Sequence, residues 1–86
     1  MAKTVLIILI GKRHDAAVNV QKVLTGWGCT IKTRLGIHDG VLDNCSDDGL
    51  LFLELVGTTE QNDELTRKLN LLESVKAELV TLSFDK

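Results

Sequence analysis

The chain has 86 residues, a net charge of -2 and a hydrophobic content of 44 %. A chain of this length forms a single domain over residues 1–86, and it buries only roughly 60 to 65 % of the surface that its unfolded form exposes. Its charge gives no basic excess that would attract nucleic acid, and its aromatic content of 3 % leaves few side chains for base stacking. The composition therefore indicates a small protein that gains burial from a partner and argues against direct nucleic-acid binding.

Residues 1–10 resemble neither a leader sequence nor a membrane span. They carry one lysine before a short apolar run, which falls far short of the ~20 residues that a membrane-spanning helix needs. The chain has two cysteines, Cys29 and Cys45, and no disulfide-rich pattern. These features predict a cytoplasmic protein with reduced thiols and no membrane partner.

Residues 4–10 are predicted to form a strand that is buried on both faces. They have the sequence Thr-Val-Leu-Ile-Ile-Leu-Ile, with branched side chains in both phases of the pleat, and a glycine ends the run. A turn that contains Arg13 and His14 then leads into a helix over residues 15–27. Gly26 weakens the last turn of this helix by about 1 kcal/mol relative to alanine, so we expect the helix to tighten or fray there.

Residues 29–37 alternate between apolar and polar side chains, which is typical of a half-covered strand. We expect the phase that contains Cys29 and Leu35 to face the core. Lys32 and Arg34 belong to the other phase, and charge in this position suits a strand at the edge of a sheet.

The strand predicted over residues 49–57 is the centre of the fold, because it is apolar in both phases and lies between two glycines. The polar connection of residues 38–48 before it is long for a link between strands, so we expect this loop to be mobile or to touch a ligand. One phase of the strand is uninterrupted and is expected to lie under the helices: Leu51, Leu53 and Leu55. The other phase carries Glu54, which we expect near the margin of an interface or paired with Lys32 or Arg34.

A second helix is predicted after Thr58, whose spacing to Gln61 is that of a capping box. Its leucines recur at helical spacing, and its charged residues complement the helix dipole at both ends. Residues 75–84 form a last strand in which the apolar phase changes at Leu79 and Val80. This change predicts either a β-bulge or a change of burial partner.

The βαββαβ order predicts an α+β protein with the ferredoxin-like sandwich, in which a four-stranded antiparallel sheet carries two helices on one face. The first and third strands should be central. The opposite face is apolar, and a wide apolar face in a soluble protein usually pairs with another copy of itself. We therefore expect a homodimer or homotetramer with these interface residues: Leu50, Phe52, Val56, Val80, Leu82 and Phe84.

A metal site is the first chemical candidate. His38 follows the second strand and Cys45 lies in the loop, and imidazole and thiolate are suitable ligands for a divalent transition metal if the two meet across a subunit interface. The sequence has no CxxC, HxH or HExxH spacing, so the alternative is a solvated loop with an incidental thiol.

An anion site is the second candidate. Residues 11–14 precede a helix, and Arg13 and His14 would offer cations and backbone amides to an anionic group, although a plain strand-to-helix turn is the alternative. Gly36 and His38 complete the set of candidate ligand-binding residues. The sequence has no Ser-His-Asp set with a glycine elbow and no catalytic carboxylate pair, so we expect no catalytic residues and no enzyme activity.

Three segments together resemble the small ACT-like proteins known as iron-only hydrogenase system regulators. They are Ile-Lys-Thr-Arg-Leu-Gly-Ile at residues 31–37, Leu-Phe-Leu-Glu-Leu-Val-Gly at residues 51–57, and a helix that leads through Leu-Leu-Glu-Ser-Val into a strand at residues 65–75. The resemblance covers nearly the whole chain. It implies the ferredoxin-like ACT fold, homo-oligomers and a regulatory role, with another regulatory protein as a candidate partner.

The wider fold group includes amino-acid-binding ACT domains, the ligand-sensing half of nickel-responsive repressors, and acylphosphatases. The sequence lacks the Pro-Gly that typically follows the first strand of amino-acid-binding ACT domains, keeps only His38 and Cys45 in places similar to the nickel site, and does not match the acylphosphatase arginine loop. The first hypothesis is a non-enzymatic, oligomerising regulatory or ligand-sensing module. The alternatives are a metal-responsive sensor that uses His38 and Cys45, and a small enzyme acting on an anionic substrate at Arg13 and His14.

Overall fold

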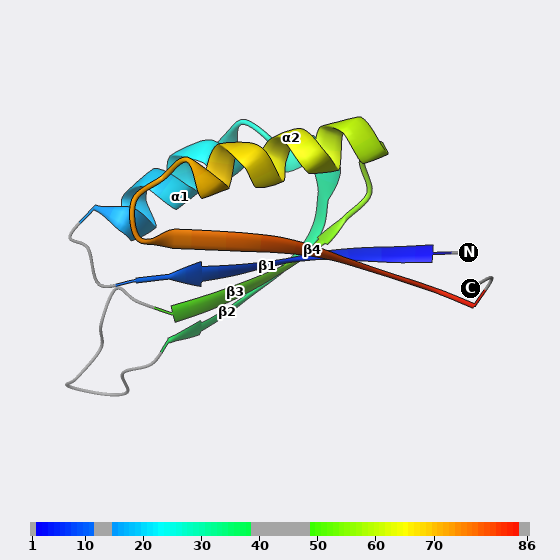
Figure 1. Cartoon of the computed structure of the whole chain (residues 1–86), viewed down its shortest axis with the longest axis horizontal. Helices are drawn as coiled ribbons and strands as arrows, with labels where there is room; N and C mark the ends of the chain where they lie inside the picture. The colour runs from blue at the N-terminus through cyan, green and yellow to red at the C-terminus, as the bar shows by residue number, and fades with distance from the viewer. Residues whose placement is uncertain (1, 12–14, 39–48, 85–86) are drawn as a thin grey trace.

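The computed structural model of the chain describes residues 2–11, 15–38 and 49–84. Its elements follow the predicted βαββαβ order, with a short 3-10 helix before the second strand (Figure 1). Their bounds are β1 (Ala2–Ile10), α1 (Ala16–Thr25), η1 (Gly28–Thr30), β2 (Ile31–His38), β3 (Gly49–Leu55), α2 (Thr59–Asn70) and β4 (Val75–Ser83). No helix in these ranges is long and apolar enough to cross a membrane.

The strands form a four-stranded antiparallel sheet in the order β2-β3-β1-β4. β1 and β3 are therefore central, and β2 and β4 are the edges. Both helices lie on one face of the sheet and leave the other face uncovered (Figure 1). The predicted ferredoxin-like sandwich is confirmed.

The core lies between the sheet and the helices. Alternate residues of β1 point to the helices, and Leu6 and Ile8 are 0 % exposed. The helices contribute Val20 from α1 and Leu65 from α2, both of which are fully buried. The predicted helix-facing phase of β3 is confirmed, because all its members are buried: Leu51, Leu53 and Leu55.

The first helix ends at Thr25, before the predicted residue 27. Gly26 is the C-terminal cap, and the amide N–H groups of Gly26 and Trp27 donate to carbonyl oxygens three residues earlier, at 3.1 Å and 3.0 Å. This is the tightened geometry expected next to a glycine. The chain then turns through η1, which places Cys29 on the surface and corrects our expectation that this cysteine lies in the core.

The second helix begins with the predicted capping box. The Gln61 amide N–H donates to Thr58 Oγ1 at 3.1 Å, and the Thr58 amide N–H donates to Gln61 Oε1 at 2.9 Å. Further along α2, Arg67 donates two hydrogen bonds to the carboxylate of Glu64, and these bonds hold the pKa of Glu64 below its usual value. That pair is exposed to solvent, so it adds little to stability.

The Thr58→Ala variant should lose about 1 kcal/mol of unfolding free energy, because the Gln61 amide then has no side-chain acceptor. Urea unfolding followed by circular dichroism measures this loss. Thr59→Ala is the matched control, since Thr59 is the next residue, is exposed and belongs to the first turn of the helix. An equal loss in both variants would contradict the capping role.

The last strand keeps an unbroken register with β1 along its whole length, so it has no bulge. Of the two explanations for its change of apolar phase, the change of burial partner is therefore the right one. Val75 and Ala77 are buried under the helices, whereas Val80 and Leu82 lie on the uncovered face of the sheet.

The second strand contains a bulge that the sequence did not reveal. Its register against β3 shifts between Ile31 and Thr33, so Lys32 is an extra residue. One inserted residue turns all later side chains to the opposite face. Leu35 and Ile37 therefore lie on the uncovered face, 57 % and 48 % exposed, and not in the core as we expected.

Candidate functional site

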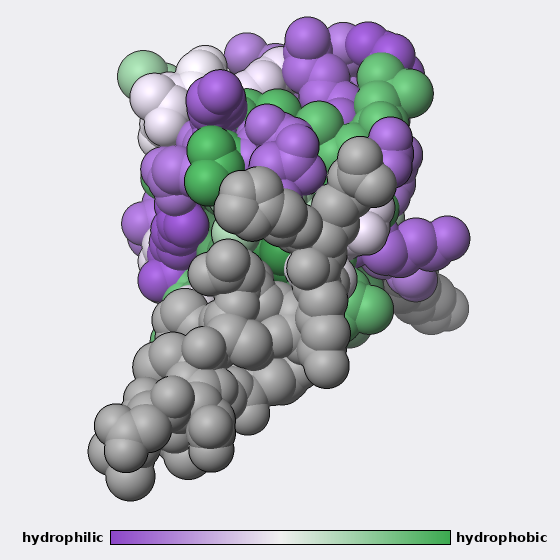
Figure 2. All heavy atoms as spheres, turned by 90° about the vertical axis from the view of Figure 1, so that its left-hand side faces the viewer, coloured by the Kyte–Doolittle hydropathy of each residue, from purple (hydrophilic) through white to green (hydrophobic). Residues whose placement is uncertain are grey.

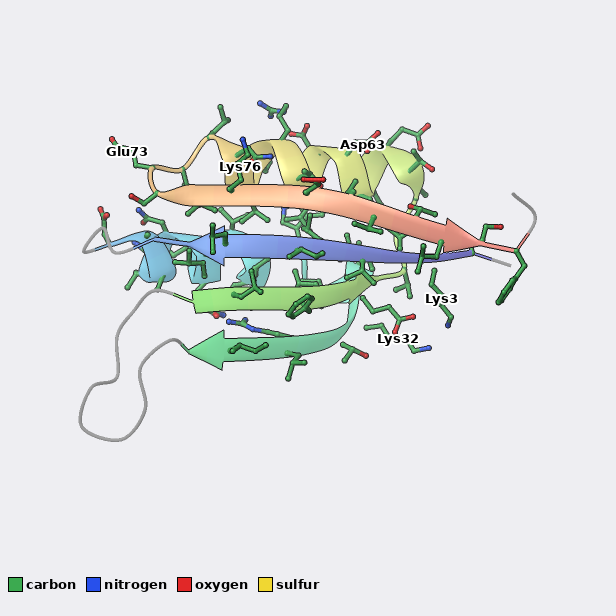
Figure 3. The ribbon with its side chains drawn as sticks, turned by 60° about the horizontal axis from the view of Figure 1, so that its bottom comes forward. Lys3, Lys32, Asp63, Glu73 and Lys76 are labelled. Atoms are coloured by element: carbon green, nitrogen blue, oxygen red, sulfur yellow. The ribbon has the colours of Figure 1, made fainter. Side chains whose placement is uncertain are left out.

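The face of the sheet that the helices leave uncovered is the widest candidate site, and we call it the open face. Figure 3 shows it in front of the helices. The strand register aligns apolar side chains from three strands in two neighbouring rows: Leu35, Phe52 and Ile7 in one, and Ile37, Leu50 and Leu9 in the next. The apolar surface is thus continuous across β2, β3 and β1, whereas on β4 the same two rows end in the charged residues Glu78 and Lys76.

The six residues predicted to form an interface belong to this face or follow its strands. Leu50 and Phe52 are half-buried by their neighbours. Val56, Val80 and Leu82 are exposed, and Phe84, which follows β4, is fully exposed. An apolar hollow of about 400 Å³ lies where β1 begins and β4 ends. It is lined by Lys3, Leu82, Ser83 and Phe84. Their role as an interface stays a prediction.

The helix layer has a different surface. Figure 2 views the molecule from the end where β1 leads towards α1, and the helices at the top of this view carry mostly hydrophilic side chains. Val18 and Leu71 are exposed apolar residues outside the sheet, but single apolar side chains are normal on a protein surface. A continuous exposed apolar area is therefore a feature of the open face.

Glu54 forms an ion pair near one end of the open face. Its Oε2 lies 3.3 Å from Nζ of Lys3 on the neighbouring strand, and the Glu54 side chain is 26 % exposed. We expected Glu54 near the margin of an interface or paired with Lys32 or Arg34. The prediction that Arg34 pairs with Glu54 is wrong. Arg34 lies opposite Leu53 in the register, so its side chain belongs to the helix-facing phase. The sequence could not show this, since the bulge decides which way Arg34 points.

Two of the predicted ligand residues, Gly36 and His38, belong to β2 at the opposite end of the sheet. His38 ends β2 and pairs with Gly49, which also pairs with Ile10 at the end of β1. Gly36 is exposed, and a Cβ built on it would meet nothing within 4 Å. The other predicted members lie outside the described residues: Arg13, His14 and Cys45. Both sets therefore stay predictions, and within the described ranges no group of three or more His, Cys, Asp and Glu could hold a metal.

The same end holds a residue with an uncommon backbone conformation. Ser74 has a φ of 61°, in the left-handed region that residues other than glycine rarely adopt. Its carbonyl oxygen accepts a hydrogen bond from the Gly11 amide at 2.7 Å, and a Cβ on Gly11 would lie 3.2 Å from Cβ of Ser74. This close contact fixes the point at which the chain leaves β1 for the predicted anion-binding turn.

Solved structures share this arrangement of strands and helices. The chain aligns with the uncharacterized protein TM1266 from Thermotoga maritima at a TM-score of 0.79 and 23 % identity, over 96 % of this chain and 100 % of that one. It aligns with the ACT domain from GTP pyrophosphokinase of Chlorobium tepidum at a TM-score of 0.62 and 15 % identity, over 93 % and 97 % of the two chains. The chain has the ferredoxin-like fold of ACT domains.

A PII-like protein has a related structure. CPII, a nitrogen regulatory PII-like protein from Thiomonas intermedia K12 bound to ADP, AMP and bicarbonate, aligns with this ACT-like chain at a TM-score of 0.54 and 13 % identity, over 95 % and 89 % of the two chains. No protein-family model matches the sequence, and no curated protein sequence matches it. At these identities the likeness establishes the fold of the chain alone.

Proposed function

We propose that this protein is a non-enzymatic regulatory module that senses a small ligand and self-associates through its open face. The observation that carries the proposal is the continuous apolar surface of two cross-strand rows, in which Leu9, Leu35 and Ile37 are about half exposed. A soluble protein rarely leaves so wide an apolar face in water. Pairing with a second copy buries it, and an isologous contact needs only one self-complementary surface.

The outer edge of β4 is a less suitable contact surface than the open face. The side chain of Asn70 binds the backbone of Ala77 twice: its Nδ2 donates to the Ala77 carbonyl at 2.9 Å, and its Oδ1 accepts from the Ala77 amide at 2.7 Å. Backbone groups that are occupied in this way cannot pair with another strand. Extension of the sheet through the first half of β4 is therefore disfavoured, which favours the open face as the contact surface.

The regulatory part of the proposal draws on the structural neighbours. One is an ACT domain of a GTP pyrophosphokinase, and another is a nitrogen regulatory PII-like protein bound to nucleotides and bicarbonate. Both support a small ligand-sensing module as the general role. The link to an iron-only hydrogenase system, and to another regulatory protein as partner, depends on the sequence resemblance alone.

Methyl NMR spectra over a dilution series test the proposed contact surface. We expect the signals of Leu35, Ile37 and Leu82 to change with protein concentration, because these side chains leave water on association. Leu53 and Leu65 are fully buried inside the monomer, so their signals should stay fixed. Signals that are independent of concentration on the open face would contradict the proposal.

A further inference from the structure

A polar hollow of about 330 Å³ lies at the end of the sheet where β1 begins. It is lined by residues from the starts of β1 and β2, the end of β3 and the first turns of α2. Figure 3 shows Lys3 and Lys32 at this end of the sheet, with side chains that reach toward the same region. A hollow of this size suits a small molecule.

The bulge in β2 brings Lys32 to the hollow. Lys32 is the extra residue between Ile31, which pairs with Leu55, and Thr33, which pairs with Glu54. Bulges often redirect a side chain beside a binding site. Lys32 is exposed, and among the residues that the structure describes no carboxylate forms an ion pair with it.

The charged side chains around the hollow have an excess of one positive charge. Lys3 is paired with Glu54 at 3.3 Å, and Lys32 adds a second ammonium group. Lysine binds phosphate and carboxylate groups as a point charge. Because Glu54 already neutralises Lys3, Lys32 is the main anchor for an anionic group of a ligand. The hollow therefore favours an anionic group close to Lys32.

Asn62 supplies a buried acceptor in the wall of the hollow. The residue is 7 % exposed, and its Oδ1 has no hydrogen-bond partner in the described part of the chain. The amide is held by one long bond, in which Nδ2 donates to the Gly57 carbonyl at 3.4 Å. A Cβ on Gly57 would lie 3.1 Å from Oδ1 and 2.8 Å from Oε1 of Gln61, so a larger residue does not fit at this position without a shift of its neighbours. A buried acceptor of this kind calls for a donor.

We propose that this hollow binds a small molecule that carries both an anionic group and an N–H or O–H donor. Lys32 and Lys3 hold the negative group, and Oδ1 of Asn62 accepts the hydrogen bond from the donor. Hydrogen phosphate and the zwitterion glycine share this chemistry, whereas sulfate and acetate are matched anions without the donor. The inference goes beyond the proposed self-association and does not depend on it.

Isothermal titration calorimetry of the full chain at constant ionic strength, with phosphate, sulfate, glycine and acetate as probes, tests the site. We expect one donor-carrying probe to bind at least about tenfold more tightly than its donor-free partner, because only that probe satisfies the buried acceptor. Preference for phosphate over sulfate would assign the site to phosphate compounds, and preference for glycine over acetate would assign it to amino compounds. Equal affinities within both pairs, or no binding of any probe, would overturn the proposal.

Two variants locate the binding. Lys32→Met should weaken binding of the preferred probe by about tenfold, whereas Lys22→Met, the same change at an exposed position of α1, should leave it unchanged. Asn62→Leu should abolish the preference for the donor-carrying probe. Because Asn62→Leu also removes the bond to Gly57 and risks misfolding, the comparison of the two lysine variants decides the site on its own. Equal affinities in those two variants would overturn it.

Discussion

The Leu35→Lys variant should be monomeric at concentrations at which the wild-type chain self-associates. Leu35 is 57 % exposed and lies on the edge strand β2, in the same row of the open face as Phe52, so a lysine there stays solvated in the monomer. In an isologous dimer, each copy would bury an ammonium group without a partner, which is strongly unfavourable. We expect the dissociation constant to rise by at least about a hundredfold, as measured by sedimentation equilibrium. Leu82→Lys should act in the same way from β4.

Val18→Lys is the matched control for this charge. Val18 is 56 % exposed, nearly the same as Leu35, but it lies on α1 in the helix layer. This variant should associate like the wild-type chain. Equal dissociation by Val18→Lys and Leu35→Lys would show that added charge alone disrupts the assembly, and an unchanged Leu35→Lys assembly would remove the open face from the contact.

Leu53→Ala should lower the free energy of unfolding by about 2 to 5 kcal/mol. Leu53 is 0 % exposed and lies between β3 and the helices, so truncation loses buried apolar surface and leaves a cavity. Urea unfolding measures the loss. Leu53→Ala and its control, Leu82→Ala, are both made in the Leu35→Lys background, so that association does not contribute to the measured stability.

Leu82→Ala is the control on the other side of the sheet. Leu82 is 69 % exposed in the monomer, so this variant should lose less than about 0.5 kcal/mol. Similar losses for Leu53→Ala and Leu82→Ala would contradict the assignment of the two faces.

The fold was predictable because several independent features of the sequence agree. The apolar runs that became β1 and β3 identify the central strands, and the capping box at Thr58 and Gln61 locates the start of α2. Glycine at position 26 indicated a tightened end of α1, which the structure confirms. Element bounds shifted by a few residues, since the hydrogen bonds of a terminal turn depend on its neighbours.

The orientation of β2 was not predictable, because its alternating pattern is the same on either face. One extra residue at Lys32 reverses the direction of Leu35 and Ile37, and no local residue type marks the insertion. In β4 the pattern indicated a bulge or a change of partner, and only the continuous pairing with β1 distinguishes them. Register is a property of two strands, and a single strand's pattern leaves it open.

The candidate site was predictable only in part. The open face follows from the alternation in β3, which placed Phe52 opposite the helix-facing leucines. The polar hollow was not predictable, because Lys3, Lys32 and Asn62 come from distant segments that only the folded chain brings together. The ion pair of Lys3 with Glu54 was not predictable for the same reason, since the pairing of β1 with β3 brings the two residues together.

The mass of the wild-type chain in solution tests self-association through the open face most directly. Size-exclusion chromatography with multi-angle light scattering, run at micromolar protein concentration, should give two or four times the 9.4 kDa of one chain. The Leu35→Lys variant run beside it should give the mass of one chain. A wild-type mass of 9.4 kDa under these conditions would contradict the account.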